Sequence, residues 1–150
     1  VFDAVRAGFN KIVFVINRHF DAEFKQLVSG KYEHVVDVAY VYQDVEDLPI
    51  EKRNPKRTAL YGSVRAVLMG RELIDGPFGV INAVNFYQKE SFELLYKHLQ
   101  TLGEADYSSV NVCYRLANVL PESGGVTRGI CELDEEGIRL EGILANIETK

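Results

Sequence analysis

A chain of 150 residues, 47% of them apolar and 26% charged, has the length and content of one compact domain with a hydrophobic core. The formal net charge of -5, from 17 basic and 22 acidic residues, argues against a general electrostatic grip on a nucleic-acid backbone. No apolar run approaches the roughly 20 residues that cross a bilayer, and no basic-then-apolar leader is visible, so we expect a cytoplasmic protein.

The first 43 residues alternate between helix and strand patterns. Apolar residues at helical spacing predict helices over 1–9 and 20–28, each ending near a glycine. Apolar runs rich in β-branched residues predict strands over 11–17 and 34–43. Because the links are short, we expect these two strands to lie parallel, joined by a right-handed crossover.

Residues 44–61 are polar and irregular, as is typical of a functional or mobile loop. A helix then opens at Gly62 and Ser63 and stops before Pro77. The apolar run "FGVINA" predicts a third strand over 78–83, and a helix with an apolar, core-facing stripe follows it.

From residue 109 the pattern changes to strands joined by Gly-rich turns, with "DEEG" at 134–137 as a hairpin connection. Cys113 and Cys131 fall inside two of these apparent strands without a short C-x-x-C spacing, which favours reduced core thiols over a zinc knuckle or a disulfide framework. The whole pattern predicts one domain over 1–150, a three-layer α/β unit with helices on both faces of a mixed sheet and a β-rich C-terminal extension.

In open α/β sheets, ligands bind beyond the carboxyl ends of the strands. The three predicted strand ends deliver Asn17 and Arg18, then Gln43, then Val84 and Asn85. The valine is unexpected, since α/β enzymes often carry a charged residue at such a position.

Five segments in this order resemble one known family: "GFNKIVFVI", "AYVYQD", "YGSVRAV", "DGPFGVINAVNFY" and "SGGVTRGICELDEEG". Together they look like the central portion of the sugar-phosphate nucleotidylyltransferases, or NDP-sugar pyrophosphorylases. The resemblance implies a Rossmann-like sheet over which a nucleoside triphosphate and a sugar 1-phosphate bind. In that family the sugar phosphate attacks the α-phosphorus and pyrophosphate leaves, with Mg²⁺ neutralising charge.

The resemblance assigns nucleotide contacts to three residues. Gln43 matches the glutamine that reads the nucleobase edge, and an amide offers both a donor and an acceptor for that task. A glutamine that ends a strand also caps neighbouring backbone groups, and both interpretations stay open. Gly62 and Ser63 match the turn that packs against base and sugar, although Ser63 is equally explained as a helix N-cap. The cations within 52–57 either reach a triphosphate or form a solvated face.

Two further matches concern the metal and the sugar. Val84 occupies the position of the family's magnesium-binding aspartate, and a hydrocarbon side chain offers no oxygen to Mg²⁺. Asn85 supplies one neutral carbonyl oxygen in its place. Arg128 and Gly129 match the turn near the sugar site, where an ordinary Gly-rich hairpin is the alternative interpretation.

The family's Gly-rich triphosphate loop would precede Val1, and its second metal-binding aspartate would follow Lys150. We therefore expect a nucleotidyltransferase that is impaired or incomplete, with a nucleoside triphosphate and a sugar phosphate as small-molecule partners and no nucleic acid or membrane. The alternative is a noncatalytic α/β module that binds a nucleotide or a partner. A sheet that lacks its central strand has unpaired edges, so we also expect self-association or a rearranged strand order.

Overall fold

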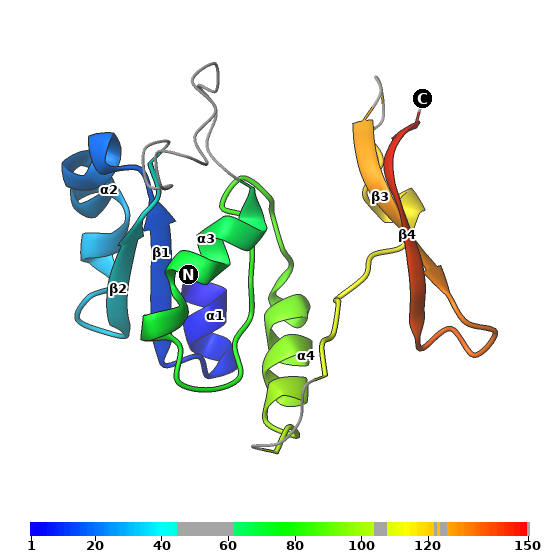
Figure 1. The fold of residues 1–150 in the computed structure, drawn as a ribbon, viewed down its shortest axis with the longest axis horizontal. Coiled ribbons are helices and arrows are strands. Elements are labelled where there is room, and N and C mark those ends of the chain that lie inside the picture. Colours follow the sequence, from blue (N-terminus) through cyan, green and yellow to red (C-terminus); the bar gives the residue numbers. More distant parts are fainter. Residues whose placement is uncertain (45–61, 104–107, 122, 124–125, 150) are drawn as a thin grey trace, which may run out of the picture. The chain divides into compact units, whose positions relative to one another are not determined.

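A computed structural model of the chain describes residues 1–44, 62–103, 108–121, 123 and 126–149 (Figure 1). The chain divides into two compact units, Val1–Val110 and Asn111–Lys150. The first unit alternates helices and strands. In chain order these are α1 (Phe2–Ala7), β1 (Lys11–Ile16), the 3-10 helix η1 (Arg18–Phe20), α2 (Asp21–Leu27), η2 (Ser29–Lys31), β2 (Asp37–Tyr42), α3 (Ser63–Met69), η5 (Arg71–Leu73) and α4 (Lys89–Leu99).

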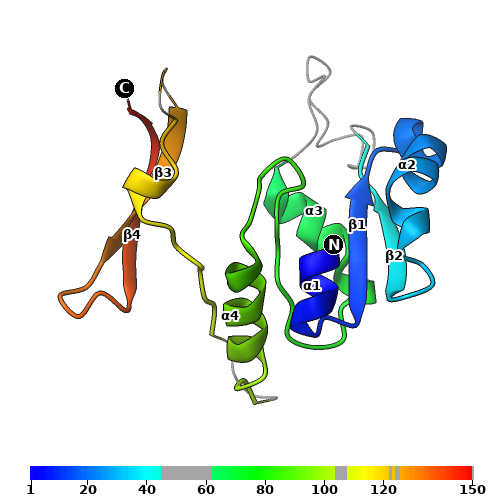
Figure 2. The same cartoon turned by 180° about the vertical axis from the view of Figure 1, so that it is seen from behind.

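β1 and β2 lie side by side and run in the same direction, which confirms the predicted parallel pair (Figures 1 and 2). Their register sets Lys11 opposite Asp37 and Ile16 opposite Tyr42. A parallel pair needs a crossover connection, and α2 provides it. The residues that follow the two strands therefore emerge at the same edge of the pair.

Aromatic side chains hold α2 on one face of this pair. The ring centroid of Phe14 lies 5.0 Å from that of Phe24 on α2, edge to face, and 6.1 Å from that of Tyr40, stacked. Val41 points to the other face because side chains alternate along a strand. It is buried, and a Cβ atom at Gly70 would lie 3.8 Å from its Cγ2. α2 and the end of α3 thus contact opposite faces of β2.

α1 ends at Gly8, where the chain packs closely against α4. Gly8 has a left-handed backbone with φ of 115°, a conformation that favours glycine. A Cβ atom at this position would lie 2.5 Å from Cζ of Tyr96. The ring of Phe9 meets the same tyrosine edge to face, with centroids 5.2 Å apart. Phe92 on α4 is buried, as the apolar stripe predicts.

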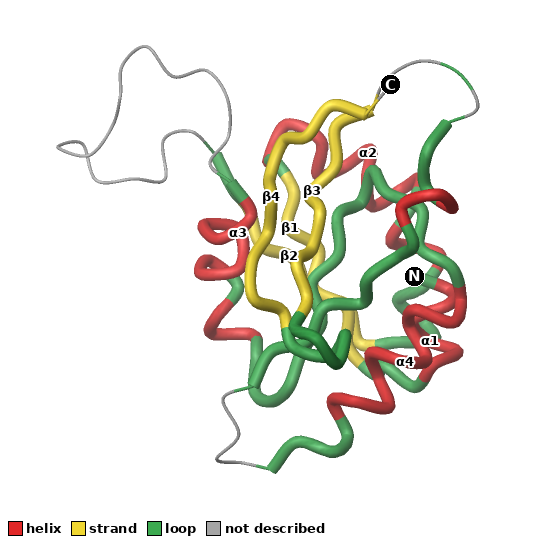
Figure 3. The backbone as a smooth tube through the Cα atoms, turned by 90° about the vertical axis from the view of Figure 1, so that its right-hand side faces the viewer, coloured by secondary structure: helices red, strands yellow, loops and turns green. Residues whose placement is uncertain are grey.

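The strand predicted over 78–83 is wrong, because residues 77–88 are loop (green in Figure 3). A strand requires a hydrogen-bonded neighbour, and no described residue pairs with this apolar run. Part of it packs on α4 instead, since a Cβ atom at Gly79 would lie 2.6 Å from Cδ2 of Leu95. The Val84 side chain, at the far end of the run, is 92% exposed.

α3 is shorter than predicted and begins differently. Its last residue is Met69, and η5 follows before the predicted stop at Gly76 and Pro77. Gly62 holds the N-cap position with extended backbone, and no side chain caps the helix. The interpretation of Ser63 as the N-cap is therefore wrong, since Ser63 is the first helical residue. Glycine is itself an accepted N-cap.

The second unit contains η6 (Leu116–Asn118) and an antiparallel pair of strands, β3 (Val126–Leu133) and β4 (Leu140–Thr149). The predicted hairpin turn is confirmed: the Asp134 N–H donates to the Arg139 carbonyl at 2.9 Å, and Gly137 has φ of 71°. The expectation that strands begin at residue 109 is wrong, since residues 109–120 form loop and η6. No described strand forms hydrogen-bonded pairs with this segment, whereas β3 and β4 pair with each other.

All side chains that are buried among the described residues belong to the first unit: Ala4, Ser29, Val36, Val41, Gln43 and Phe92. None of the helices in the described ranges combines the length and the hydrophobicity that crossing a bilayer would require.

Candidate functional site

The carboxyl ends of β1 and β2 place four polar residues at one edge. Asn17 and Arg18 follow β1, while Gln43 and Asp44 follow β2, and the Gln43 N–H donates to the Ile16 carbonyl at 2.9 Å. This bond extends the parallel ladder by one residue and fixes the two strand ends side by side. The juxtaposition predicted for Asn17, Arg18 and Gln43 is therefore confirmed.

Arg18 and Asp44 form an ion pair across this edge. The Arg18 Nε lies 3.0 Å from Oδ2 of Asp44, and the Arg18 backbone N–H is 3.5 Å from its Oδ1. The guanidinium also lies over the ring of Tyr42, with Cζ 4.7 Å from the centroid. Asn17 shapes the turn because its Oδ1 accepts a 2.8 Å hydrogen bond from the His19 N–H. The cation at the strand end is thus held in place but already neutralised.

Gln43 is 6% exposed, and it is not without a partner. A base that reads its amide must reach a side chain that is buried at present. Both interpretations of this glutamine, as a base reader and as a structural cap, are compatible with its place at the strand end. Its burial distinguishes it from the exposed Gln26 on α2.

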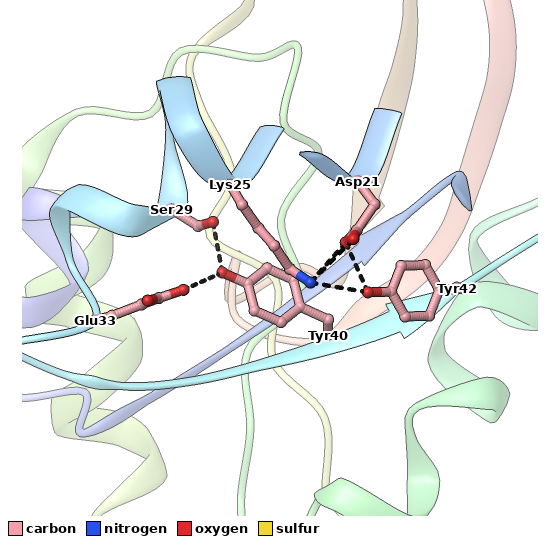
Figure 4. Close-up of polar contacts among 6 residues, drawn as sticks. All are labelled: Asp21, Lys25, Ser29, Glu33, Tyr40 and Tyr42. Carbon is pink, nitrogen blue, oxygen red and sulfur yellow. Dashed lines mark hydrogen bonds and ion pairs between the residues drawn. The ribbon is translucent and has the colours of Figure 1, made fainter. Parts of the chain in front are cut away.

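A second polar cluster lies between α2 and β2 (Figure 4). Tyr42 donates to Oδ1 of Asp21 at 2.6 Å, and the Lys25 Nζ donates to Oδ2 of Asp21 at 3.0 Å and to the Tyr42 hydroxyl at 3.2 Å. The hydrogen bond from Tyr42, followed by that from Lys25, lowers the pKa of Asp21 below its usual value. The bond to Asp21 raises the pKa of Lys25 in turn. Lys25 therefore stays protonated at neutral pH and is unsuited to act as a general base.

The cluster continues along the same face through Tyr40. The Tyr40 hydroxyl lies 2.6 Å from Oε1 of Glu33 and 2.5 Å from the Ser29 Oγ (Figure 4). With a single proton, the tyrosine donates to the carboxylate and accepts from the buried serine. Burial raises the pKa of Tyr40, and the bond to Glu33 adds to the rise. The Lys25 Nζ, 4.5 Å from the ring centroid of Tyr40, joins the two halves.

The cations of these two clusters already have acidic partners. Arg18 and Lys25 are each matched by a carboxylate, Asp44 and Asp21 respectively. An anionic ligand at the strand ends must compete with those carboxylates for the cations.

Gly62 and Ser63 stand at the start of α3 and are exposed. Among the described residues, no atom lies within 4 Å of the place where a Cβ atom would stand on Gly62. The close approach of a base or sugar to Gly62 stays a prediction. Side chains 45–61, including the basic residues at 52–57, lie outside the described residues.

The residues at the predicted metal position do not fit a magnesium ion. Val84 is 92% exposed and has no ligand atom, and the Asn85 Nδ2 lies 3.4 Å from the Tyr87 hydroxyl. The turn is closed by a 3.2 Å bond from the Asn85 N–H to the Asn82 carbonyl. Across the described parts of the chain, no group of three His, Cys, Asp or Glu side chains gathers to hold a metal. Mg²⁺ prefers carboxylate oxygens, which this turn does not supply.

Arg128 and Gly129 lie on β3, and the hairpin is irregular at this point. The register shifts between Arg128 and Ile130, so two residues of β4 stand opposite Gly129. A Cβ atom at Gly129 would lie 3.3 Å from Cγ2 of Ile143, which gives this glycine a packing role. The side chain of Arg128 lies outside the described part.

The Asp21, Lys25 and Tyr42 cluster was missed by the sequence interpretation. Two signals were available for it. Asp21 and Lys25 stand four apart on a helix, the spacing at which opposite charges meet. Tyr40 and Tyr42 share one face of a strand, so their hydroxyls point to the helix that covers it. Spacing within one element does not predict how α2 packs on β2, so it could not show that these side chains meet.

No family model matches this chain, and no curated protein sequence is significantly similar to it.

Proposed function

We propose that this chain is a nucleotidyltransferase-like α/β module that binds a nucleoside triphosphate or a nucleotide sugar at the carboxyl ends of β1 and β2. The observation that carries the proposal is the adjacency of Gln43 with Arg18 at the ends of two parallel strands. In open α/β sheets this edge is the usual ligand site. With it we propose a three-layer, Rossmann-like sheet, which is supported by the contacts of α2 and of the end of α3 with opposite faces of β2.

Each residue has a distinct role in the proposed site. Gln43 offers an amide to the edge of the base, and Gly62 leaves room for base and sugar. Arg18 binds phosphate after its ion pair with Asp44 opens. Lys25, which pairs with Asp21, is a more distant second cation for the phosphate. Arg128 and Gly129 are the proposed sugar contacts. Because Val84 supplies no metal ligand, we propose that nucleotidyl transfer by this chain is impaired while nucleotide binding persists.

Binding is tested by calorimetric titration of the chain with ATP, GTP, CTP, UTP and dTTP. We expect one of them to bind with a dissociation constant below about 1 mM, and Gln43→Ala to weaken that binding by roughly tenfold, since about 1.4 kcal/mol of hydrogen bonding to the base is lost. Gln26→Ala, which removes an exposed amide from α2, should leave the affinity unchanged. Circular dichroism controls for folding, because Gln43 is buried. Absence of binding by all five nucleoside triphosphates and by nucleotide sugars contradicts the proposal.

A noncatalytic module that binds a nucleotide or a partner is the second candidate, favoured by the hydrocarbon at Val84. Magnesium-dependent release of pyrophosphate from a nucleoside triphosphate and a hexose 1-phosphate would exclude it.

We propose self-association as the partner interaction, because β1 and β2 form a two-stranded sheet among the described residues and Val84 and Phe86 are 92% and 87% exposed. Light scattering that shows a monomer at all concentrations would rule out self-association.

A further inference from the structure

The two cysteines of the chain, predicted as separate core thiols, meet in the second unit. The Sγ atoms of Cys113 and Cys131 lie 3.6 Å apart, which is contact distance for two thiols. Cys113 is exposed and belongs to the segment before η6, where its Sγ is also 3.8 Å from the Asn111 carbonyl oxygen. Cys131 is half-buried on β3, opposite Ile143 of β4. Cys113 is thus the more exposed residue of the pair, and Cys131 is the more buried one.

We propose that Cys113 and Cys131 are an oxidisable dithiol that closes to an intrachain disulfide in the presence of a low-molecular-weight disulfide such as oxidised glutathione. The sulfurs must approach from 3.6 Å to a bond of about 2.05 Å, which side-chain rotation and a small shift of the exposed loop supply. Metal binding by the two thiols is less well supported, since no group of three or more His, Cys, Asp or Glu side chains gathers around them in the described structure.

The reaction consists of two exchanges. The exposed Cys113 thiolate attacks one sulfur of oxidised glutathione, forming a mixed disulfide and releasing one glutathione thiolate. The Cys131 thiolate then attacks the Sγ of Cys113 and displaces the second glutathione. The two thiols of the protein lose two electrons and two protons, and oxidised glutathione becomes two molecules of reduced glutathione.

Exposure decides the order of these exchanges, and protonation sets their rate. Partial burial raises the pKa of the Cys113 thiol, and the hydrogen bond with Cys131 adds to the rise. Only the thiolate attacks, so closure is slow at neutral pH and accelerates as the pH rises toward the raised pKa.

The disulfide would tie the loop at 111–113 to the middle of β3. The described side chains of this unit include none that is buried, so loop and hairpin are held by few apolar contacts. A covalent link between segments 18 residues apart restricts the unfolded chain, which stabilises the closed arrangement. The oxidation state of the two cysteines therefore determines how strongly the loop at 111–113 is held against β3.

The test uses the unmodified chain in glutathione buffers of graded ratio, followed by acid quench and mass spectrometry without reductant. We expect a loss of about 2 Da, and tryptic peptides 98–115 and 129–139 joined to each other. The equilibrium constant for closure should be at least about tenfold larger in the folded chain than in the same chain in urea, because folding brings the sulfurs together.

Two variants make the test specific to this geometry. Cys131→Ser should stop at a glutathione adduct on Cys113. Cys131→Ser combined with Ile130→Cys moves the second thiol to the opposite face of β3 and should lower the closure constant to the level of the unfolded chain. Stable glutathione adducts on both wild-type cysteines, predominantly intermolecular disulfides, or equal closure constants for the folded and unfolded chain would overturn the proposal.

Discussion

The unit of residues 1–110 and the unit of residues 111–150 stabilise their strands in different ways. In the first, helices cover the parallel pair, and Val41 and Phe92 are buried at 8% and 7% exposure. In the second, two antiparallel strands pair with each other, and large apolar side chains such as Ile143 remain about half exposed. A two-stranded hairpin alone is marginally stable in water. The strands of the first unit are therefore stabilised by side-chain burial, and those of the second by the hydrogen bonds between β3 and β4.

The sharpest test of this difference is truncation of a large apolar side chain in each unit. Phe92→Ala removes a buried ring whose centroid lies 6.2 Å from that of Tyr87, and we expect it to lower the free energy of unfolding by about 3 kcal/mol or more. Ile143→Ala, at 52% exposure, should cost less than about 1 kcal/mol. Urea unfolding followed by circular dichroism measures the first, and amide hydrogen exchange of the hairpin measures the second.

The matched control for Phe92 is Leu94, two residues along the same helix and 60% exposed. Leu94→Ala should change the unfolding free energy by no more than about 0.5 kcal/mol, because helix propensity is nearly unaffected and little burial is lost. Equal losses from the two positions would contradict the assignment of the core to the Phe92 face of α4.

Glycines offer a second, smaller comparison, since each unit contains one with positive φ. Gly8 combines a φ of 115° with a missing Cβ that would lie 2.5 Å from Tyr96, whereas Gly137 has φ of 71° and nothing within 4 Å. Gly8→Ala should therefore destabilise by about 2 kcal/mol from strain and clash, and Gly137→Ala by about 1 kcal/mol from strain alone.

Thermal unfolding of the two glycine variants gives the difference directly. Gly76→Ala is the control, since this glycine has neither positive φ nor an atom within 4 Å of the added carbon. A Gly8 variant as stable as that control would show that α4 moves freely away from α1.

Local pattern predicted most of the regular elements correctly. Helical spacing located α1, α2 and α4, and β-branched runs located β1 and β2, because these signals arise within a single element. It failed at 78–83, where an apolar run has strand composition but no described hydrogen-bonded neighbour. Whether a run becomes a strand depends on its partner, and the run itself does not specify one.

In the candidate site, too, the features that arise within single elements or between neighbouring strands were predictable, and contacts between distant segments were not. Asn17, Arg18 and Gln43 were expected together because parallel strands end at one edge, and the register confirms it. The contact of Cys113 with Cys131 was not expected, since it joins a loop to a strand 18 residues away. Periodicity carries no information about such a meeting. For the same reason, an exposed loop at Val84 was mistaken for the tip of a strand.

The smallest expected effect concerns the hairpin turn and its dependence on pH. Oδ1 of Asp134 accepts bonds from the backbone N–H groups of Ile138 at 2.8 Å and Arg139 at 3.0 Å. The bonds from Ile138, Arg139 and Gly137 lower the pKa of Asp134 in the folded hairpin. A carboxyl whose pKa is lower when folded stabilises the fold above its unfolded pKa of about 3.9, and this contribution is lost as the pH falls through the folded pKa.

We therefore expect amide exchange at Ile138 and Arg139 to lose protection at acid pH, and Asp134→Ala to lose it at every pH. Asp134→Asn keeps an acceptor oxygen that does not titrate, so its protection should be intermediate and independent of pH in this range. Exchange measured by NMR between pH 2.5 and 6, corrected for intrinsic rates, separates the three cases. A flat profile in the wild-type chain would mean that the turn does not need the Asp134 charge, and the backbone bond between Asp134 and Arg139 would then have to hold the hairpin alone.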